Sequence, residues 1–236
     1  MCIKYKYIQE RVFMKENNSV SNSFYQDLKN GIIELKYYPG SVLTTQELSN
    51  EYGISRTPVR EALVRLREEN FLRESSGNKF VVSEITWKTI EDLYKLRVIM
   101  ESASIRAAKG KITKDCIARL RKETEKIQTA LDNRNYHEMF LADQNYHNEI
   151  LSICDNMFMK DIYRNLSDHQ RRIRFLTAGI ESRLQNTVKE HNRITDCLEK
   201  GDIENATRYI EAHFDGTLAD LKHLREINPM FNNAIK

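Results

Sequence analysis

One carboxylate and three imidazole side chains in the C-terminal half of the chain have a spacing that could hold a metal ion. Asp143 and His147 are four residues apart, so a helix would project both side chains from one face. His191 and His213 flank Gly201-Asp202, a pattern typical of a helix stop followed by an N-cap. Each histidine is about 11 residues, or roughly 16 Å of helix, from that bend, so an antiparallel helix pair would bring them nearly level.

A carboxylate and three imidazoles suit a divalent transition metal such as Zn²⁺, Ni²⁺ or Mn²⁺, with one or two positions left for water or a ligand. The competing interpretation is that they are unrelated surface or core residues, because many charged pairs on helices are merely solvated. His137, His169 and His223 lack partners at a comparable spacing, and we interpret them as surface or structural histidines. The predicted metal ligands are therefore Asp143, His147, His191 and His213.

The length and composition predict a mainly helical protein with two domains. The chain has 236 residues, which exceeds the usual single-domain size of about 100 to 150. Hydrophobic residues make up 40% and charged residues 30%, with only eight glycines and three prolines, a composition that favours long amphipathic helices. The formal net charge of +3 does not by itself indicate a nucleic-acid binder, so any basic surface must be local.

The cysteines and the N-terminus bear on the compartment. Cys2, Cys116, Cys154 and Cys197 show no paired short spacing. No apolar run near the N-terminus has the length of a signal peptide or a membrane helix. We therefore expect a cytoplasmic protein with reduced thiols and no membrane partner.

The first part of the chain predicts a domain over residues 19–85. Residues 1–18 are interpreted as a tail, with two alternatives: Met14 could be the working initiator, or the segment could dock as an extra helix. Apolar residues recur at helical spacing over 23–34, and Tyr38-Pro39-Gly40 is a turn signal that ends this first helix.

Two further helices with a tight turn between them are predicted next. Thr44 or Thr45 would cap a short helix, Gly53 supplies the break, and Ser55 would cap a longer helix that runs to about Asn70. Two helices joined by a tight glycine-containing turn form the helix-turn-helix pattern.

A hairpin pattern and then a bundle pattern follow. Short β-prone runs at 71–73 and 80–82 predict a small wing that completes the first domain. Residues 86–228 predict an all-helical antiparallel bundle for effector binding and dimerisation, followed by a tail over 229–236. The helical patterns of the bundle span about 87–108, 113–132, 135–153, 156–178, 184–200 and 203–226.

The helix that begins after Ser55 has the pattern of a DNA-recognition helix. Arg56, Thr57 and Arg60 share one solvent face of its first turn, while Pro58 presets the helix start without losing a hydrogen bond. Arginines on the leading turn of such a helix can bond to guanine O6 and N7 in the major groove. Ordinary solvated surface arginines are the competing interpretation. Helix, turn, helix and hairpin in this order favour the recognition helix. The core-facing positions are Val59, Ala62, Leu63 and Leu66.

The segment Pro39-Gly40, Leu48 and Ser55-Arg56-Thr57-Pro58-Val59-Arg60-Glu61-Ala62-Leu63 resembles the GntR-type bacterial regulators. The resemblance implies that Arg56 and Arg60 read bases and that Ser55 and Thr57 hold phosphates or base edges. Gln46 would lie near the DNA, at a position where the family often has a basic residue. Lys79 falls where the family has a wing-tip glycine, and it could reach a phosphate instead. The implied DNA-binding set is Gln46, Ser55, Arg56, Thr57, Pro58, Arg60 and Lys79.

The bundle resembles the FCD effector domain of the FadR subfamily of these regulators. Asp143-x-x-x-His147, Glu190-His191 and His213 occur in the order in which that domain supplies its metal ligands. The resemblance also points to Arg97 as a partner for a bound carboxylate, which a guanidinium can hold bidentately. A surface or helix-pair salt bridge between Arg97 and Glu101 is the equally weighted alternative.

These patterns together predict a transcriptional regulator, with a repressor as the expected sign. A homodimer would bind a pseudo-palindromic operator on double-stranded DNA, one recognition helix per half-site. A small organic acid bound in the metal-bearing bundle would change the affinity for the operator, provided that it prefers one arrangement of the two DNA-binding domains.

Two other functions are compatible with a metal site. In a direct metal-ion sensor, the ion itself would be the signal. In a metal-dependent hydrolase, the ion would activate water. The hydrolase is disfavoured because the sequence has no His-Glu-x-x-His motif and no nucleophile elbow, and because it leaves the winged helix unexplained. We therefore expect a regulator rather than an enzyme.

Overall fold

The computed structural model describes residues 21–76, 79–177, 181–227 and 235, without the side chains of 175–177 and 181–184. The predicted tail over 1–18, with its alternatives at Met14, lies outside these residues. Backbone contacts divide the chain into two compact units between Glu84 and Ile85.

The described residues of the N-terminal unit form three helices, a first one over 21–33 and the two of the helix-turn-helix. The helix α2 (Thr45–Tyr52) begins where the Thr44 side chain accepts a hydrogen bond from the backbone of Glu47. It ends at Gly53, which has a φ of 65° and so supplies the left-handed turn before α3 (Arg56–Glu68). Ser55 holds the N-cap position of α3 without a side-chain capping bond.

A three-stranded antiparallel sheet completes this unit, in the order β1-β3-β2. The strands β2 (Leu72–Ser75) and β3 (Lys79–Val82) form the predicted hairpin. The strand β1 (Val42–Thr44) was not predicted, and it pairs with β3 so that Val42 lies opposite Val81. The winged helix-turn-helix therefore contains a strand before α2 as well as the wing.

One hydrophobic core holds the three helices against the sheet. The α3 positions predicted to face inward, Val59, Ala62, Leu63 and Leu66, are all buried. They pack with the first helix, represented by Leu28 and Ile32, and with Phe80 and Val82 of β3. Removal of this apolar surface from water is what orients α3, so that its remaining face points outward.

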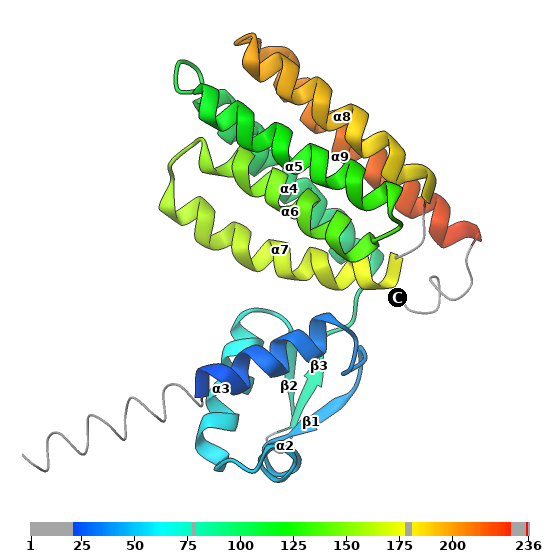
Figure 1. Cartoon of the computed structure of the whole chain (residues 1–236). Helices are drawn as coiled ribbons and strands as arrows, with labels where there is room; N and C mark the ends of the chain where they lie inside the picture. The colour runs from blue at the N-terminus through cyan, green and yellow to red at the C-terminus, as the bar shows by residue number, and fades with distance from the viewer. Residues whose placement is uncertain (1–20, 77–78, 178–180, 228–234, 236) are drawn as a thin grey trace, which may run out of the picture. The chain divides into compact units, whose positions relative to one another are not determined.

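The C-terminal unit is a helical bundle, which Figure 1 shows as long helices packed side by side. Its helices match the predicted helical patterns to within three residues at their ends. In chain order they are α4 (Trp87–Ala107), α5 (Lys114–Asp132), α6 (Tyr136–Ser152), α7 (Met157–Thr177), α8 (Glu181–Glu199) and α9 (Ile203–Ile227).

The bundle core joins all six helices, α7 through Ile173, around residues such as Leu120, Ile150, Ile194 and Ile210, each fully buried. Ile235, within the segment 229–236 that was predicted to be a tail, is buried in the same core. The burial of this side chain is expected, because removing an isoleucine from water lowers the free energy of the folded state.

The start of α4 carries the sole tryptophan of the sequence. The indole Nε1 of Trp87 donates a hydrogen bond to Glu91 at 2.9 Å, and the ring packs beside the bundle core. The guanidinium carbon of Arg225 lies 5.8 Å from the ring centre. The indole at the start of α4 therefore contacts a cation near the end of α9, the last helix of the bundle.

Two smaller findings concern the cysteines and the polarity of the helices. Cys116, Cys154 and Cys197 are free thiols. Within the described ranges, every helix is too short or too polar to cross a membrane.

Candidate functional site

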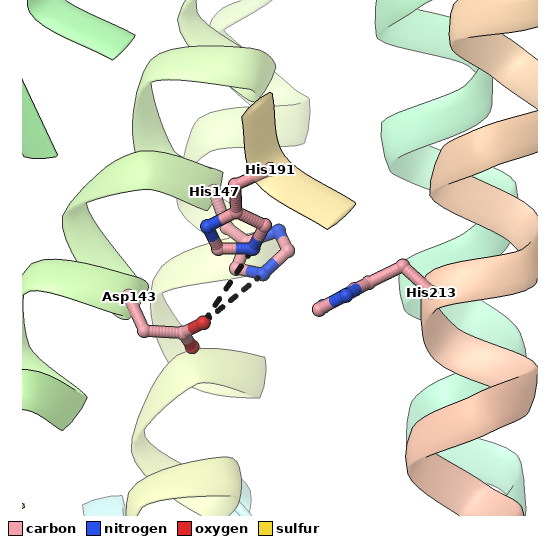
Figure 2. A group of neighbouring side chains, drawn as sticks. All are labelled: Asp143, His147, His191 and His213. Carbon is pink, nitrogen blue, oxygen red and sulfur yellow. Dashed lines mark ion pairs between the residues drawn. The ribbon is translucent and has the colours of Figure 1, made fainter. Parts of the chain in front are cut away.

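The four predicted metal ligands converge in the interior of the bundle. Asp143 and His147 come from α6, His191 from α8 and His213 from α9, and all four are buried. One potential ligand atom from each residue lies within 4.8 Å of those of the other three. Figure 2 shows the Asp143 carboxylate facing the rings of His147 and His191, with His213 extending toward them from α9.

The distances place the carboxylate at one side of the imidazole group. Asp143 Oδ1 lies 3.7 Å from His147 Nε2 and 3.6 Å from His191 Nε2. The ring centres of His191 and His213 are 4.9 Å apart, so the two histidines on either side of the Gly201 bend do lie level. Gly201 has a φ of 72°, the left-handed conformation that a sharp helix-to-helix turn requires.

Two of the imidazoles are oriented by carboxylates on their other nitrogen. His147 Nδ1 lies 2.6 Å from Glu101 Oε2, and His213 Nδ1 lies 2.7 Å from Glu190 Oε2. Where such a carboxylate is ionised it can only accept, so the imidazole then donates from Nδ1 and its Nε2 carries the lone pair that a metal would bind. Metal-binding histidines in proteins usually have this outer partner.

The third imidazole is held by stacking. The ring of His191 lies parallel to that of Tyr146, with an interplanar angle of 6° and 3.8 Å between centres. The Tyr146 hydroxyl donates to the His191 carbonyl at 3.0 Å and lies 3.0 Å from the Thr195 hydroxyl. The tyrosine therefore fixes both the ring plane and the local backbone.

Asp143 has a cationic partner as well as the three imidazoles. The guanidinium of Arg174 on α7 donates to Asp143 Oδ2 and to the carbonyl of Phe140, the latter at 3.0 Å. Burial would raise the pKa of the Asp143 carboxyl, but Arg174 and the imidazoles outweigh it and hold that pKa well below its ordinary value. Asp143 is therefore ionised, with Oδ1 toward the imidazoles and Oδ2 toward Arg174.

Arg97 is not on the surface. It is completely buried and pairs with Glu101, to which its Nη2 donates at 2.9 Å, and it also donates to the Tyr163 hydroxyl at 2.7 Å. The predicted alternative of a helix-pair salt bridge is therefore found, but inside the bundle. Burial raises the pKa of Glu101 to about 7 against the opposing effects of Arg97 and Tyr163. Burial, followed by Arg97, lowers the pKa of His147 well below its ordinary value, so this imidazole is neutral.

The residues present fit a divalent transition metal. Neutral imidazole nitrogens and an ionised carboxylate are its preferred ligands. The His147 Nε2 atom is buried and has no hydrogen-bond partner among the described residues, as expected of a ligand atom. A metal bound here would be held by Asp143, His147, His191 and His213, and would add a strong positive charge to the interior.

A small cavity of about 80 Å³ adjoins these ligands. Its wall includes Arg97, whose Nη1 atom is buried and makes no hydrogen bond within the described part of the chain. A buried guanidinium donor without an acceptor is costly, so an anion that entered the cavity would be stabilised there. His137 and His223 are exposed, and His169 also lies outside the ligand cluster.

The second candidate site is the outer face of the helix-turn-helix. Arg56, Thr57 and Arg60 are exposed on the first turn of α3, and Pro58 is half-buried between them and the core. The Arg56 guanidinium donates to the side chain of Gln46 on α2, which in turn donates to Asn50 at 2.9 Å. Gln46 therefore orients the first arginine of α3.

Lys79 does not occupy the tip of the wing. It is the first residue of β3, where it pairs with Ser75 of β2 and with Thr44 of β1, and its side chain is exposed. The predicted tip position is wrong because the hairpin register places the turn between Ser75 and Lys79. If Lys79 contacts a DNA phosphate, it does so from the first position of β3.

Two family models match the chain in the same order as its two units. The model of the bacterial regulatory proteins of the gntR family matches residues 21–82, and the FCD domain model matches 92–216. The chain belongs to the GntR family and carries an FCD domain.

Two relatives of this GntR-family protein are named as transcriptional regulators, and the similarity covers almost the whole length of each. It is 26% identical to the HTH-type transcriptional regulator YdhC of Bacillus subtilis, over 86% of this chain and 91% of that protein. It is 24% identical to the HTH-type transcriptional repressor RspR of Escherichia coli, over 89% and 92%. The solved structure of E. coli McbR/YncC has the same fold, with a TM-score of 0.71 over 86% of this chain and 97% of that one, at 21% identity. The protein is therefore a DNA-binding transcriptional regulator.

Three side chains that shape the regulator's site were not predicted from the sequence. Arg174 and Tyr163 lie on α7, which supplies no ligand, and Tyr146 is on α6 beside His147. Tyr146 could have been found, since it is three residues after Asp143 and thus near it on the helix face. Arg174 and Tyr163 give no such signal, because their contacts depend on how α7 packs against α4 and α6.

Proposed function

We propose that this regulator is a repressor that binds a pseudo-palindromic operator as a homodimer. The exposed first turn of α3 supports this, with Arg56 and Arg60 as the base-reading residues and Ser55, Thr57, Gln46 and Lys79 as nearby contacts. Two recognition helices of a two-fold dimer would contact half-sites about 34 to 36 Å apart. The relative RspR is named a transcriptional repressor, which supports repression rather than activation.

The metal-binding part of the proposal concerns a Zn²⁺, Ni²⁺ or Mn²⁺ ion held by Asp143, His147, His191 and His213. The observation that carries it is the convergence of the four ligand atoms to within 4.8 Å in a fully buried cluster. Replacing one ligand at a time, as in His191→Ala and His213→Ala, should lower the metal content measured by elemental analysis. His137→Ala, on an exposed histidine, is the control. Full metal retention in the double variant His191→Ala/His213→Ala would remove both residues from the site.

The effector in this proposal is a small organic acid. In this interior Asp143 already pairs with Arg174, and Glu101 pairs with Arg97. A divalent cation would add two positive charges to this interior, which a carboxylate ligand would offset. The buried Nη1 donor of Arg97, which has no hydrogen-bond partner in the described part of the chain, supports the same inference, since Arg97 lines the cavity beside the metal ligands.

A direct metal-ion sensor is the second candidate, and the cavity volume favours it. About 80 Å³ holds an ion with a few waters, but little of an organic molecule. Operator binding measured with metal-free and metal-loaded protein, each with and without a panel of carboxylic acids, separates the two. Metal alone changes operator affinity in a sensor, whereas the acid is needed in an effector-controlled regulator.

A further inference from the structure

A surface groove runs along α6 and the C-terminal half of α7, next to the metal-ligand cavity. It has a volume of about 520 Å³. Tyr136, Phe140, Leu141 and Gln144 of α6 lie along one side, and Arg171 and Arg174 of α7 along the other. The groove is not used by the function proposed above.

Phe140 and Arg174 line both the groove and the inner cavity, so they form the wall between them. Arg174 donates to the Phe140 carbonyl at 3.0 Å, and its guanidinium carbon lies 5.4 Å from the Phe140 ring centre. On the cavity side the same guanidinium pairs with Asp143. Through Arg174, this wall connects the groove to Asp143, one of the candidate metal ligands.

The lining chemistry of the groove suits an organic anion. The described lining residues include two arginines and a histidine, three side-chain amides and three aromatic or aliphatic side chains, and no carboxylate. Arg171 faces Asp168 at 3.7 Å, a loose pair that leaves its guanidinium able to attract an anion. Tyr136, Phe140 and Leu141 offer an apolar surface for the body of such a molecule.

The two volumes differ in what they can hold. The inner cavity of about 80 Å³ has room for a carboxylate group, but not for a molecule of ordinary ligand size. The groove of about 520 Å³ lies within the range of roughly 300 to 1,000 Å³ that small-molecule sites occupy. A ligand that used both would have its acid group at the wall and its body outside.

We propose that the groove is an outer compartment of the effector site and that it binds the body of an organic acid with an aromatic or extended apolar part. The acid's carboxylate is directed to the Phe140–Arg174 wall, and its body lies against Tyr136 and Leu141. This inference rests on the proposed carboxylate effector, and it narrows that class to acids much larger than acetate.

The test uses two probes on the full-length, zinc-loaded protein, namely acetate and 4-phenylbutyrate, with binding measured by calorimetry. Leu141→Trp fills the groove, and since Leu141 is 46% exposed the fold should tolerate the larger side chain. Tyr209→Trp, at a 40% exposed position on α9, is the matched control. We expect 4-phenylbutyrate to bind wild type and Tyr209→Trp alike, and to bind Leu141→Trp at least tenfold more weakly, with acetate binding unchanged in all three.

Other outcomes overturn the inference. Equal 4-phenylbutyrate affinity in wild type and Leu141→Trp would exclude the groove. Loss of both acids in Leu141→Trp would also overturn the two-compartment arrangement, because acetate should not touch the groove. Binding of acetate alone to wild type would remove the outer compartment but keep the carboxylate effector. Binding of neither probe would contradict the carboxylate effector as well.

Discussion

Glu101 connects Arg97 to His147: its Oε1 accepts from the Arg97 guanidinium at 2.9 Å, and its Oε2 lies 2.6 Å from His147 Nδ1. The same carboxylate therefore neutralises the candidate effector-binding residue and orients a candidate metal ligand. In the proposed function, an anion that bound Arg97 at Nη1 would weaken the pairing of the guanidinium with Glu101, and through Glu101 the change would reach the imidazole of His147. In the proposed function, Glu101 would therefore link the candidate metal ligand His147 to the candidate effector partner Arg97.

Replacing the carboxylates behind the imidazoles should weaken metal binding without removing a ligand. We expect Glu101→Gln and Glu190→Gln each to lower metal affinity by about 10 to 100-fold, because an amide orients and polarises an imidazole less well than a carboxylate. Competition with a chelator of known affinity measures the effect. Glu199→Gln, on the exposed side of α8, should leave the affinity unchanged. Unaltered affinity in both test variants would show that these carboxylates do not support the ligands.

Breaking the buried Arg97–Glu101 pair should destabilise the bundle. Both side chains are inaccessible to solvent, so Arg97→Met leaves the buried Glu101 without its cationic partner and should cost about 3 to 5 kcal/mol of unfolding free energy. The double variant Arg97→Met/Glu101→Leu should recover much of that loss, because it removes both charges. Urea unfolding of the metal-free protein gives the free energies. A double variant less stable than Arg97→Met would contradict the charge argument.

The arginines on α3 should determine operator affinity. Arg56→Ala and Arg60→Ala should each weaken binding to the selected operator by about 1 to 3 kcal/mol while the fold stays intact. Gel-shift titration at fixed salt with an operator selected from random sequences measures this. Arg208→Ala removes an exposed arginine from the bundle and is the control. If both α3 variants keep wild-type affinity, α3 is not the recognition helix.

The acid stability of the N-terminal unit should depend on Glu69. Its carboxylate lies 2.8 Å from Lys29 Nζ and 2.7 Å from the Tyr25 hydroxyl. Burial raises the pKa of Glu69, but Lys29 and Tyr25 outweigh it, and the net pKa lies below the ordinary value of 4.5. The pKa of Glu69 is lower in the folded protein than in the unfolded chain. The ionised Glu69 therefore stabilises the folded unit fully above about pH 4.5, and this stabilisation is lost as the pH falls through the folded pKa.

Glu69→Gln should therefore destabilise the N-terminal unit at neutral pH by about 1 to 3 kcal/mol and make its stability less sensitive to acid. Hydrogen exchange of the amides in residues 21–76, measured from pH 7 down to about pH 3, follows this unit within the whole protein. Glu68→Gln, on the neighbouring exposed residue of α3, is the matched control. The same acid sensitivity in Glu69→Gln as in wild type would contradict the assignment.

The sequence predicted the helices and the ligand cluster because both depend on local periodicity. Asp143 and His147 must share a face of one helix, and the glycine at 201 determines where α8 and α9 meet. Arg174 could not be predicted, because its contact with Asp143 depends on the packing of α7 against α6. The strand β1 has only three residues, too few for an alternation pattern, and the position of Lys79 depended on a hairpin register that no local rule determines.

The position of Trp87 gives the protein a built-in optical probe. It is the one tryptophan in the sequence and belongs to the bundle, while the N-terminal unit contains tyrosines but no tryptophan. Intrinsic tryptophan emission therefore reports the bundle alone, whereas circular dichroism reports helices of both units. Recorded on one sample during denaturation, the two signals will coincide if the units unfold together and will separate if each unit melts independently.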